Sequence, residues 1–194
     1  MTVQTIAGAK EFEYAGSSVS TSPTGEFIAV GYKEISNGPV EKTGLVRVYQ
    51  RNSEGTHFSL GVDSIFGAAP GDEFGASISI SNNGQLVVVG ARSSSSPDKE
   101  NTGEVKIFEF SKSPNSWTPL GSSIQALEEN DRLGFSVSLS GDGDGQRVAV
   151  GAPRGNGGTG SASVHQYNGL GLILVGNIVV VLGFQCHYQF MGLH

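Results

Sequence analysis

Two apolar patterns alternate along this chain, and both are patterns of β-strands. The first places apolar residues and serines in strict alternation, which is typical of a strand with one face against a core. It occurs at residues 77–81 and 136–140. The second is apolar at every position, as expected of a strand covered on both faces. It occurs at residues 27–30, 86–89 and 148–150.

Short turns join the two patterns, and each contains a glycine that can supply the positive φ of a hairpin turn. These glycines are Gly25, Gly84 and Gly145. The sequence therefore predicts antiparallel hairpins, with the fully apolar strand at the centre of each sheet.

Two further strand patterns follow each hairpin. The third strand comes after a longer polar loop and is predicted at residues 44–49, 103–108 and 160–165. The fourth is shorter and is predicted at residues 56–60, 116–120 and 172–175. Four antiparallel strands without an intervening helix predict the sheet of a β-propeller blade.

The four-strand unit recurs with a period of 59 residues. Isoleucines and glycines mark it, at Ile6, Ile65 and Ile124 and at Gly16, Gly75 and Gly134. The predicted fold is all-β, with about three blades of four antiparallel strands in a partial propeller. The expected blades are about 6–64, 65–123 and 124–175. We expect residues 1–168 to form the repeat region, followed by a different segment at 169–194.

Three blades are too few for an ordinary ring, because propellers usually close with about 4 to 8 blades. A single sheet cannot cover both of its own faces. We therefore expect a piece of a longer propeller protein, a truncated gene product, or a protomer that covers its open blade faces by self-association.

Composition and charge limit the kinds of partner and site that this chain can have. A hydrophobic content of 37% with 29 glycines fits a soluble, turn-rich protein. The net charge of −6 argues against nucleic acid, which requires clustered Lys and Arg. Cys186 is the only cysteine, so the chain can form no internal disulfide and no cysteine-based zinc site.

Paired motifs mark the boundaries of two hairpins: Phe74-Gly75 with Gly90-Ala91, and Gly134-Phe135 with Gly151-Ala152-Pro153. These boundaries resemble the FG-GAP repeat family of integrin α-type propellers. The resemblance extends over residues 1–168 and is clearest at 73–168. It implies a propeller module and is compatible with an extracellular or cell-surface parent, while the sequence does not fix the compartment. We expect such a module to bind a protein or glycan through its blade loops.

The resemblance also raises the possibility of calcium, since integrin-type blades often carry a calcium loop in the first hairpin. Only Asp142 and Asp144 come close to that motif, and Val148 stands where the closing carboxylate belongs. We interpret this turn as an Asp/Gly-rich solvated turn and predict no metal site. A calcium-dependent adhesion module stays an alternative.

Candidate catalytic groups are sparse. We find no acid, base or nucleophile that recurs or clusters, so we predict a non-catalytic protein without a cofactor. The alternative is a propeller enzyme whose site is assembled from inter-blade loops, for example from Asp63, Asp72 and Asp131. We expect a packing role for Trp117 and a packing or surface role for His165, which replaces the aromatic residues of the first two blades.

The last segment differs in kind, because residues 155–194 contain no charged side chain. A membrane helix needs about 20 apolar residues, and the strictly apolar part is shorter. We interpret residues 169–194 as a degenerate or truncated fourth blade and expect no membrane partner. A membrane-associated tail is the alternative.

Overall fold

The computed structural model describes residues 4–8, 13–35, 42–61, 64–140, 147–167 and 172–178. Every regular element in these ranges is a strand, and the strands form three antiparallel sheets. The prediction of an all-β, partial propeller with three sheets is thereby confirmed. Asp63, Asp142, Asp144, Cys186 and residues 179–194 lie outside the described residues. No helix in the described ranges is long and apolar enough to cross a membrane.

Each sheet begins with the predicted hairpin and continues in chain order. The first sheet contains β1 (Ala15–Thr21), β2 (Phe27–Tyr32), β3 (Leu45–Arg51), β4 (Phe58–Leu60) and β5 (Ile65–Phe66). The second contains β6 (Phe74–Ile80), β7 (Leu86–Ala91), β8 (Glu104–Ser111), β9 (Ser116–Pro119) and β10 (Ile124–Gln125). The third contains β11 (Ser136–Leu139), β12 (Arg147–Ala152), β13 (Ser161–Tyr167) and β14 (Leu172–Ile178).

Two short strands were not predicted. β5 and β10 each pair with the third strand of their sheet, beyond the end of the fourth. They begin at the periodic isoleucines Ile65 and Ile124. In the third sheet β14 is longer than predicted, and Ile178 pairs with Ala162 as Ile124 pairs with Val105. The chain limits proposed for each blade and for the last segment stay predictions.

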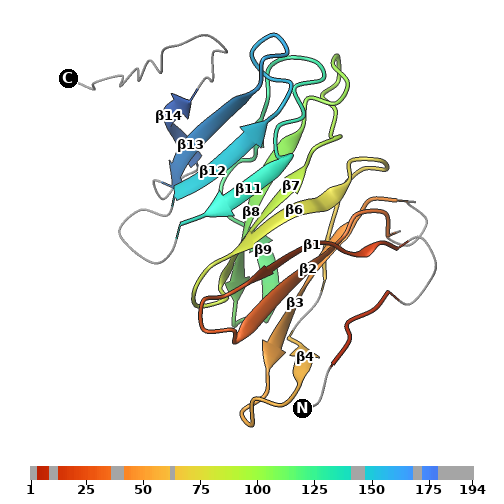
Figure 1. Cartoon of the computed structure of the whole chain (residues 1–194), viewed down its shortest axis with the longest axis vertical. Coiled ribbons are helices and arrows are strands. Elements are labelled where there is room, and N and C mark those ends of the chain that lie inside the picture. Colours follow the sequence, from red (N-terminus) through yellow and green to blue (C-terminus); the bar gives the residue numbers. More distant parts are fainter. Residues whose placement is uncertain are drawn as a thin grey trace.

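The three sheets lie side by side, with β1, β6 and β11 as neighbours near the middle of the stack (Figure 1). One apolar core fills the space between the first and second sheets, and another fills the space between the second and third. Val87, Val88 and Val89 are fully buried, because β7 is covered on both faces. The stack is open and does not close into a ring.

Candidate functional site at the loop end of the sheets

The long loops gather at one end of each sheet, which we call the loop end. In the first sheet Ala15, Tyr32 and Leu45 are aligned there, and the loops after β2 and β5 leave from it. Backbone bridges from Gly44 to Phe74 and from Gly103 to Leu133 bring the loop ends of successive sheets together. The opposite end carries the short hairpin turns.

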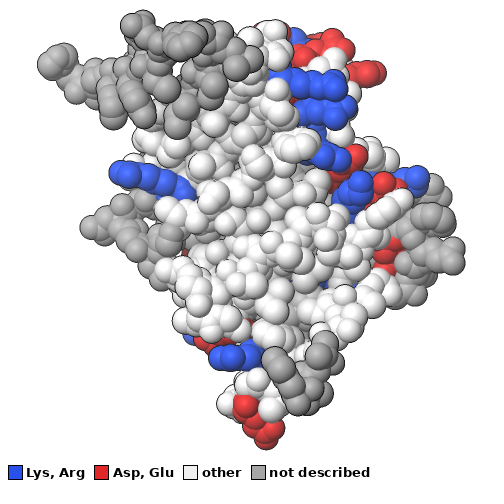
Figure 2. Space-filling view, in the orientation of Figure 1, with Lys and Arg blue, Asp and Glu red and all other residues white. Residues whose placement is uncertain are grey.

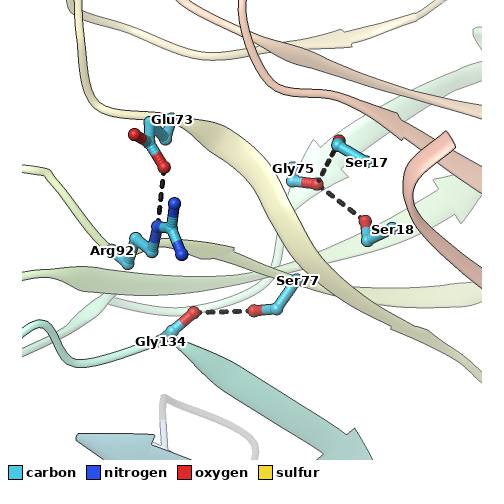
Figure 3. Close-up of polar contacts among 7 residues, drawn as sticks. All are labelled: Ser17, Ser18, Glu73, Gly75, Ser77, Arg92 and Gly134. Carbon is cyan, nitrogen blue, oxygen red and sulfur yellow. Dashed lines mark hydrogen bonds and ion pairs between the residues drawn. The ribbon is translucent and has the colours of Figure 1, made fainter. Parts of the chain in front are cut away.

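Serines of the alternating strand connect successive sheets close to the loop end. The Ser18 hydroxyl donates to the Gly75 carbonyl and the Ser77 hydroxyl to the Gly134 carbonyl, both at 2.7 Å (Figure 3). We call this contact the serine clasp. It requires a glycine on the second strand, because a Cβ at Gly31 or Gly90 would lie 2.2 Å from the accepting carbonyl oxygen. The serines therefore have a structural role, because they hydrogen-bond one sheet to the next.

A cavity of about 350 Å³ opens at the loop end between the first and second sheets. Its lining combines two cations, one aromatic ring and small residues: Tyr14, Ala15, Gly16, Ser17, Lys33, Ala76 and Arg92. The Lys33 ammonium lies 5.1 Å from the centre of the Tyr14 ring. A cavity with this lining suits an anionic group, since ammonium and guanidinium groups donate charge-assisted hydrogen bonds to carboxylates.

In the equivalent space between the second and third sheets, an aromatic ring stands in place of a small residue. Phe135 stands one period after Ala76, and the Arg92 guanidinium lies 5.1 Å from the centre of its ring. Arg92 also forms an ion pair of 2.6 Å with Glu73, which stands one period after Tyr14 (Figure 3). The cavity therefore lies beside the small Ala76, whereas the equivalent position one repeat later holds the Phe135 ring.

Tyr14 lines the cavity, and the residue at its position has the same unusual backbone conformation in all three repeats. Tyr14 has φ +49°, Glu73 +54° and Arg132 +55°. Positive φ is uncommon for residues other than glycine, so the shared value places three different side chains at one structural position. The backbone is repeated here while the chemistry changes from aromatic to acidic to basic.

One recurring acid escaped the sequence analysis, and the statement that no acid recurs was wrong. Glu13, Asp72 and Asp131 are spaced by 59 residues. Burial raises the pKa of the Asp72 and Asp131 carboxyls, while hydrogen bonds to the backbone of Ala69 and Glu128 oppose the shift. Each of these two carboxylates thus pairs with the residue three positions before it, which is a loop-fixing contact. The described residues contain no group of three or more metal-ligating side chains.

Two other singled-out residues pack as expected. His165 is buried, pairs in register with Val148 and lies 2.8 Å from the Ser163 hydroxyl. Burial lowers its pKa. Trp117 packs against the core between the first two sheets and against the Phe110 ring at 5.5 Å. Its buried indole N–H has no hydrogen-bond partner within the described residues.

Successive antiparallel sheets joined through their first strands define a propeller-type repeat protein. Residues 67–108 match the FG-GAP repeat, so the resemblance seen in the sequence is confirmed for β6, β7 and most of β8. Among solved structures the chain is similar to the propeller-like Saccharomyces cerevisiae Sqt1, with a TM-score of 0.51 and 16% identity. The alignment covers 93% of this chain and 38% of Sqt1, so the chain spans about two fifths of that protein. No curated protein matches the sequence at a significant level.

Proposed function

We propose that this chain is a non-catalytic propeller repeat module that binds a protein ligand at the loop end. An acidic side chain of the ligand enters the cavity between Lys33 and Arg92. The observation that carries the proposal is the cavity itself, in a position where the next repeat holds the Phe135 ring.

The charges at the cavity favour a carboxylate over a neutral glycan. Arg92 is already paired with Glu73, whereas Lys33 faces the Tyr14 ring and forms no ion pair with a described residue. A ligand carboxylate would pair with the Lys33 ammonium without displacing a resident acid. The apolar face of Tyr14 would cover the ligand's side-chain methylenes.

The enzyme alternative finds less support at this end of the sheets. Asp72 and Asp131 are engaged with their own loops, one in each repeat. The calcium alternative rests on Asp142 and Asp144, which lie outside the described residues, and it stays a prediction.

The test is selection from a displayed library of random octapeptides on the folded protein. We expect enrichment of Asp or Glu at one position of the selected peptides. Replacing that residue by its amide should weaken binding at least tenfold, the effect of losing about 1.4 kcal/mol of charge-assisted hydrogen bonding.

Lys33→Met should abolish the enrichment, because it removes the charge but keeps an apolar stem. Lys112→Met is the matched control, since it removes one positive charge from the β8–β9 turn at the opposite end. Selection of peptides without an acidic preference, or equal results for the two variants, would contradict the proposal.

A further inference from the structure

Three contacts recur wherever one sheet meets the next. The serine clasp is the first. In the second, the backbone N–H of Ile80 or Leu139 donates to a serine hydroxyl of the preceding sheet, Ser20 or Ser79, at 3.2 and 2.9 Å. The third is the backbone bridge from Gly44 or Gly103 to the following sheet. Each sheet therefore has a leading face, which contacts the preceding sheet, and a trailing face, which contacts the following one.

The leading face of the first sheet has the same backbone geometry as the leading faces of the later sheets. Gly16 has φ +82°, close to +86° at Gly75 and +82° at Gly134. A register shift between Ala15 and Ser18 matches the one between Phe74 and Ser77. The Gly16 carbonyl thus stands where the clasp acceptors stand.

This leading face is uncovered at β1 only, because Val30, Tyr32 and Leu45 beside it are buried against the chain's own Ile6 and Ile35. Val19 is 64% exposed, whereas Ile78, its equivalent in the second sheet, is 7% exposed in the core against the first sheet. The exposure of Val19 is what Ile78 would show without its neighbour.

The third sheet has the complementary trailing face. Ser136 and Ser138, the equivalents of Ser77 and Ser79, are exposed on β11. Ala149 on β12 is also exposed, although its equivalents Ala29 and Val88 are fully buried between sheets.

A glycine completes this face. A Cβ at Gly44 or Gly103 would lie about 2 Å from the carbonyl oxygen of the next sheet, at 2.1 and 2.2 Å. At the equivalent Gly160 the nearest atom to such a Cβ is the carbonyl oxygen of Pro153 in its own loop, at 3.1 Å. Its φ of +84° is nevertheless that of the other two.

We infer that the trailing face of one copy binds the leading face of a second copy. The Ser136 hydroxyl of one chain donates to the Gly16 carbonyl of the other, and Val19 is covered. A second copy is the occupant indicated, because the same chain carries both halves of the serine clasp, the Ser136 hydroxyl and the Gly16 carbonyl. Such a contact is heterologous and closes when the rotation permits; two copies supply six sheets, within the range of closed propellers.

Figure 2 shows one face of the stack almost free of charged side chains, with Lys, Arg, Asp and Glu gathered at its edges.

Ala149 replaces the larger Val88, so the contact between copies has less apolar area than the contacts within one chain. We therefore expect a dimer that dissociates on dilution.

The test is sedimentation equilibrium of the whole chain at several concentrations. We expect the mass to rise from monomer to dimer for the wild type. Ala149→Glu or Val19→Glu should each weaken dimerisation at least tenfold. Leu127→Glu, at an 81% exposed position of the loop between β10 and β11, should leave it unchanged. Ser138→Lys is a second trailing-face variant, should Ala149→Glu unfold.

Mixing the two variants identifies the geometry. An Ala149→Glu copy and a Val19→Glu copy share one intact pair of faces, so the mixture should form a heterodimer that neither variant forms alone. A monomeric wild type at every concentration would overturn the inference. So would a dimer that survives both substitutions, or two variants that fail to associate on mixing.

Discussion

The two interfaces between sheets have the same framework and different chemistry. Both use a serine clasp over a glycine, and both enclose an apolar core. At the loop end they diverge: Ala76 leaves a cavity beside Tyr14 and Lys33, whereas Phe135 lies against Arg92. The comparison teaches that the repeated positions specify the fold, and that the candidate site lies where the repeat changes.

The largest effect on stability is expected from disrupting the serine clasp between two sheets. A Cβ at Gly90 would lie 2.2 Å from the Gly134 backbone oxygen of the next sheet, which cannot rotate away. Gly90→Val should lower the free energy of unfolding by about 3 kcal/mol or more. Gly151→Val is the matched control, because its Cβ meets only the rotatable Ser136 hydroxyl at 2.4 Å. Urea denaturation measures both, and equal losses would contradict a clasp between sheets.

Removing the aromatic ring between the second and third sheets should have the next largest effect on stability. Phe135→Ala should lower the free energy of unfolding by about 1–2 kcal/mol, since the ring is 44% exposed and loses only part of a full core contact. It should also open a second cavity beside Arg92. Thermal melting and a crystal structure measure the two results. An unchanged melting temperature would contradict a packing role for Phe135.

Removing a single clasp donor is a smaller change. Ser77→Ala leaves the Gly134 carbonyl without its donor and should cost about 1 kcal/mol. Ser136→Ala, at the exposed equivalent, should change the stability of the monomer by less than about 0.5 kcal/mol. Urea denaturation at low protein concentration compares them. Equal effects would show that the hydroxyls contribute nothing specific between sheets.

The smallest expected effect is a pH dependence of stability. It comes from His165, so it belongs to the third sheet and not to the first two. Because burial lowers the pKa of His165 below 6.5, the unfolded chain takes up a proton first as the pH falls. Wild-type stability should then decline as the pH falls from 6.5 towards that lower pKa, and is fully present above 6.5.

His165→Phe restores the aromatic residue found at Phe108 and should remove this part of the pH dependence. Urea denaturation at pH 8 and pH 5.5 measures the difference. Equal slopes with pH for the wild type and the variant would contradict burial of the neutral imidazole.

Much of the fold could be predicted because strand alternation and a 59-residue period are properties of neighbouring positions. The hairpins, the central strands and the His165 equivalence all followed from them. β5 and β10 could not, because a two-residue strand is too short for any alternation. Their only signal was the periodic isoleucine.

The candidate site could not be predicted for a related reason. Tyr14, Lys33, Ala76 and Arg92 are far apart in the sequence and meet only when two sheets pack. A comparison of equivalent positions could have found the change from Ala76 to Phe135, and also the recurring Glu13, Asp72 and Asp131. A small residue in a strand is recognised as significant only when the equivalent residue of the next repeat is large.

The central claim is that the cavity beside Ala76 is the binding site, and filling it is the direct test. Ala76→Phe places there the residue that the next repeat already holds, so the fold should be retained. Calorimetric titration with an acid-containing peptide selected on the wild type should then show at least a tenfold loss of affinity, about 1.4 kcal/mol. Undiminished affinity in a correctly folded Ala76→Phe protein would contradict the account.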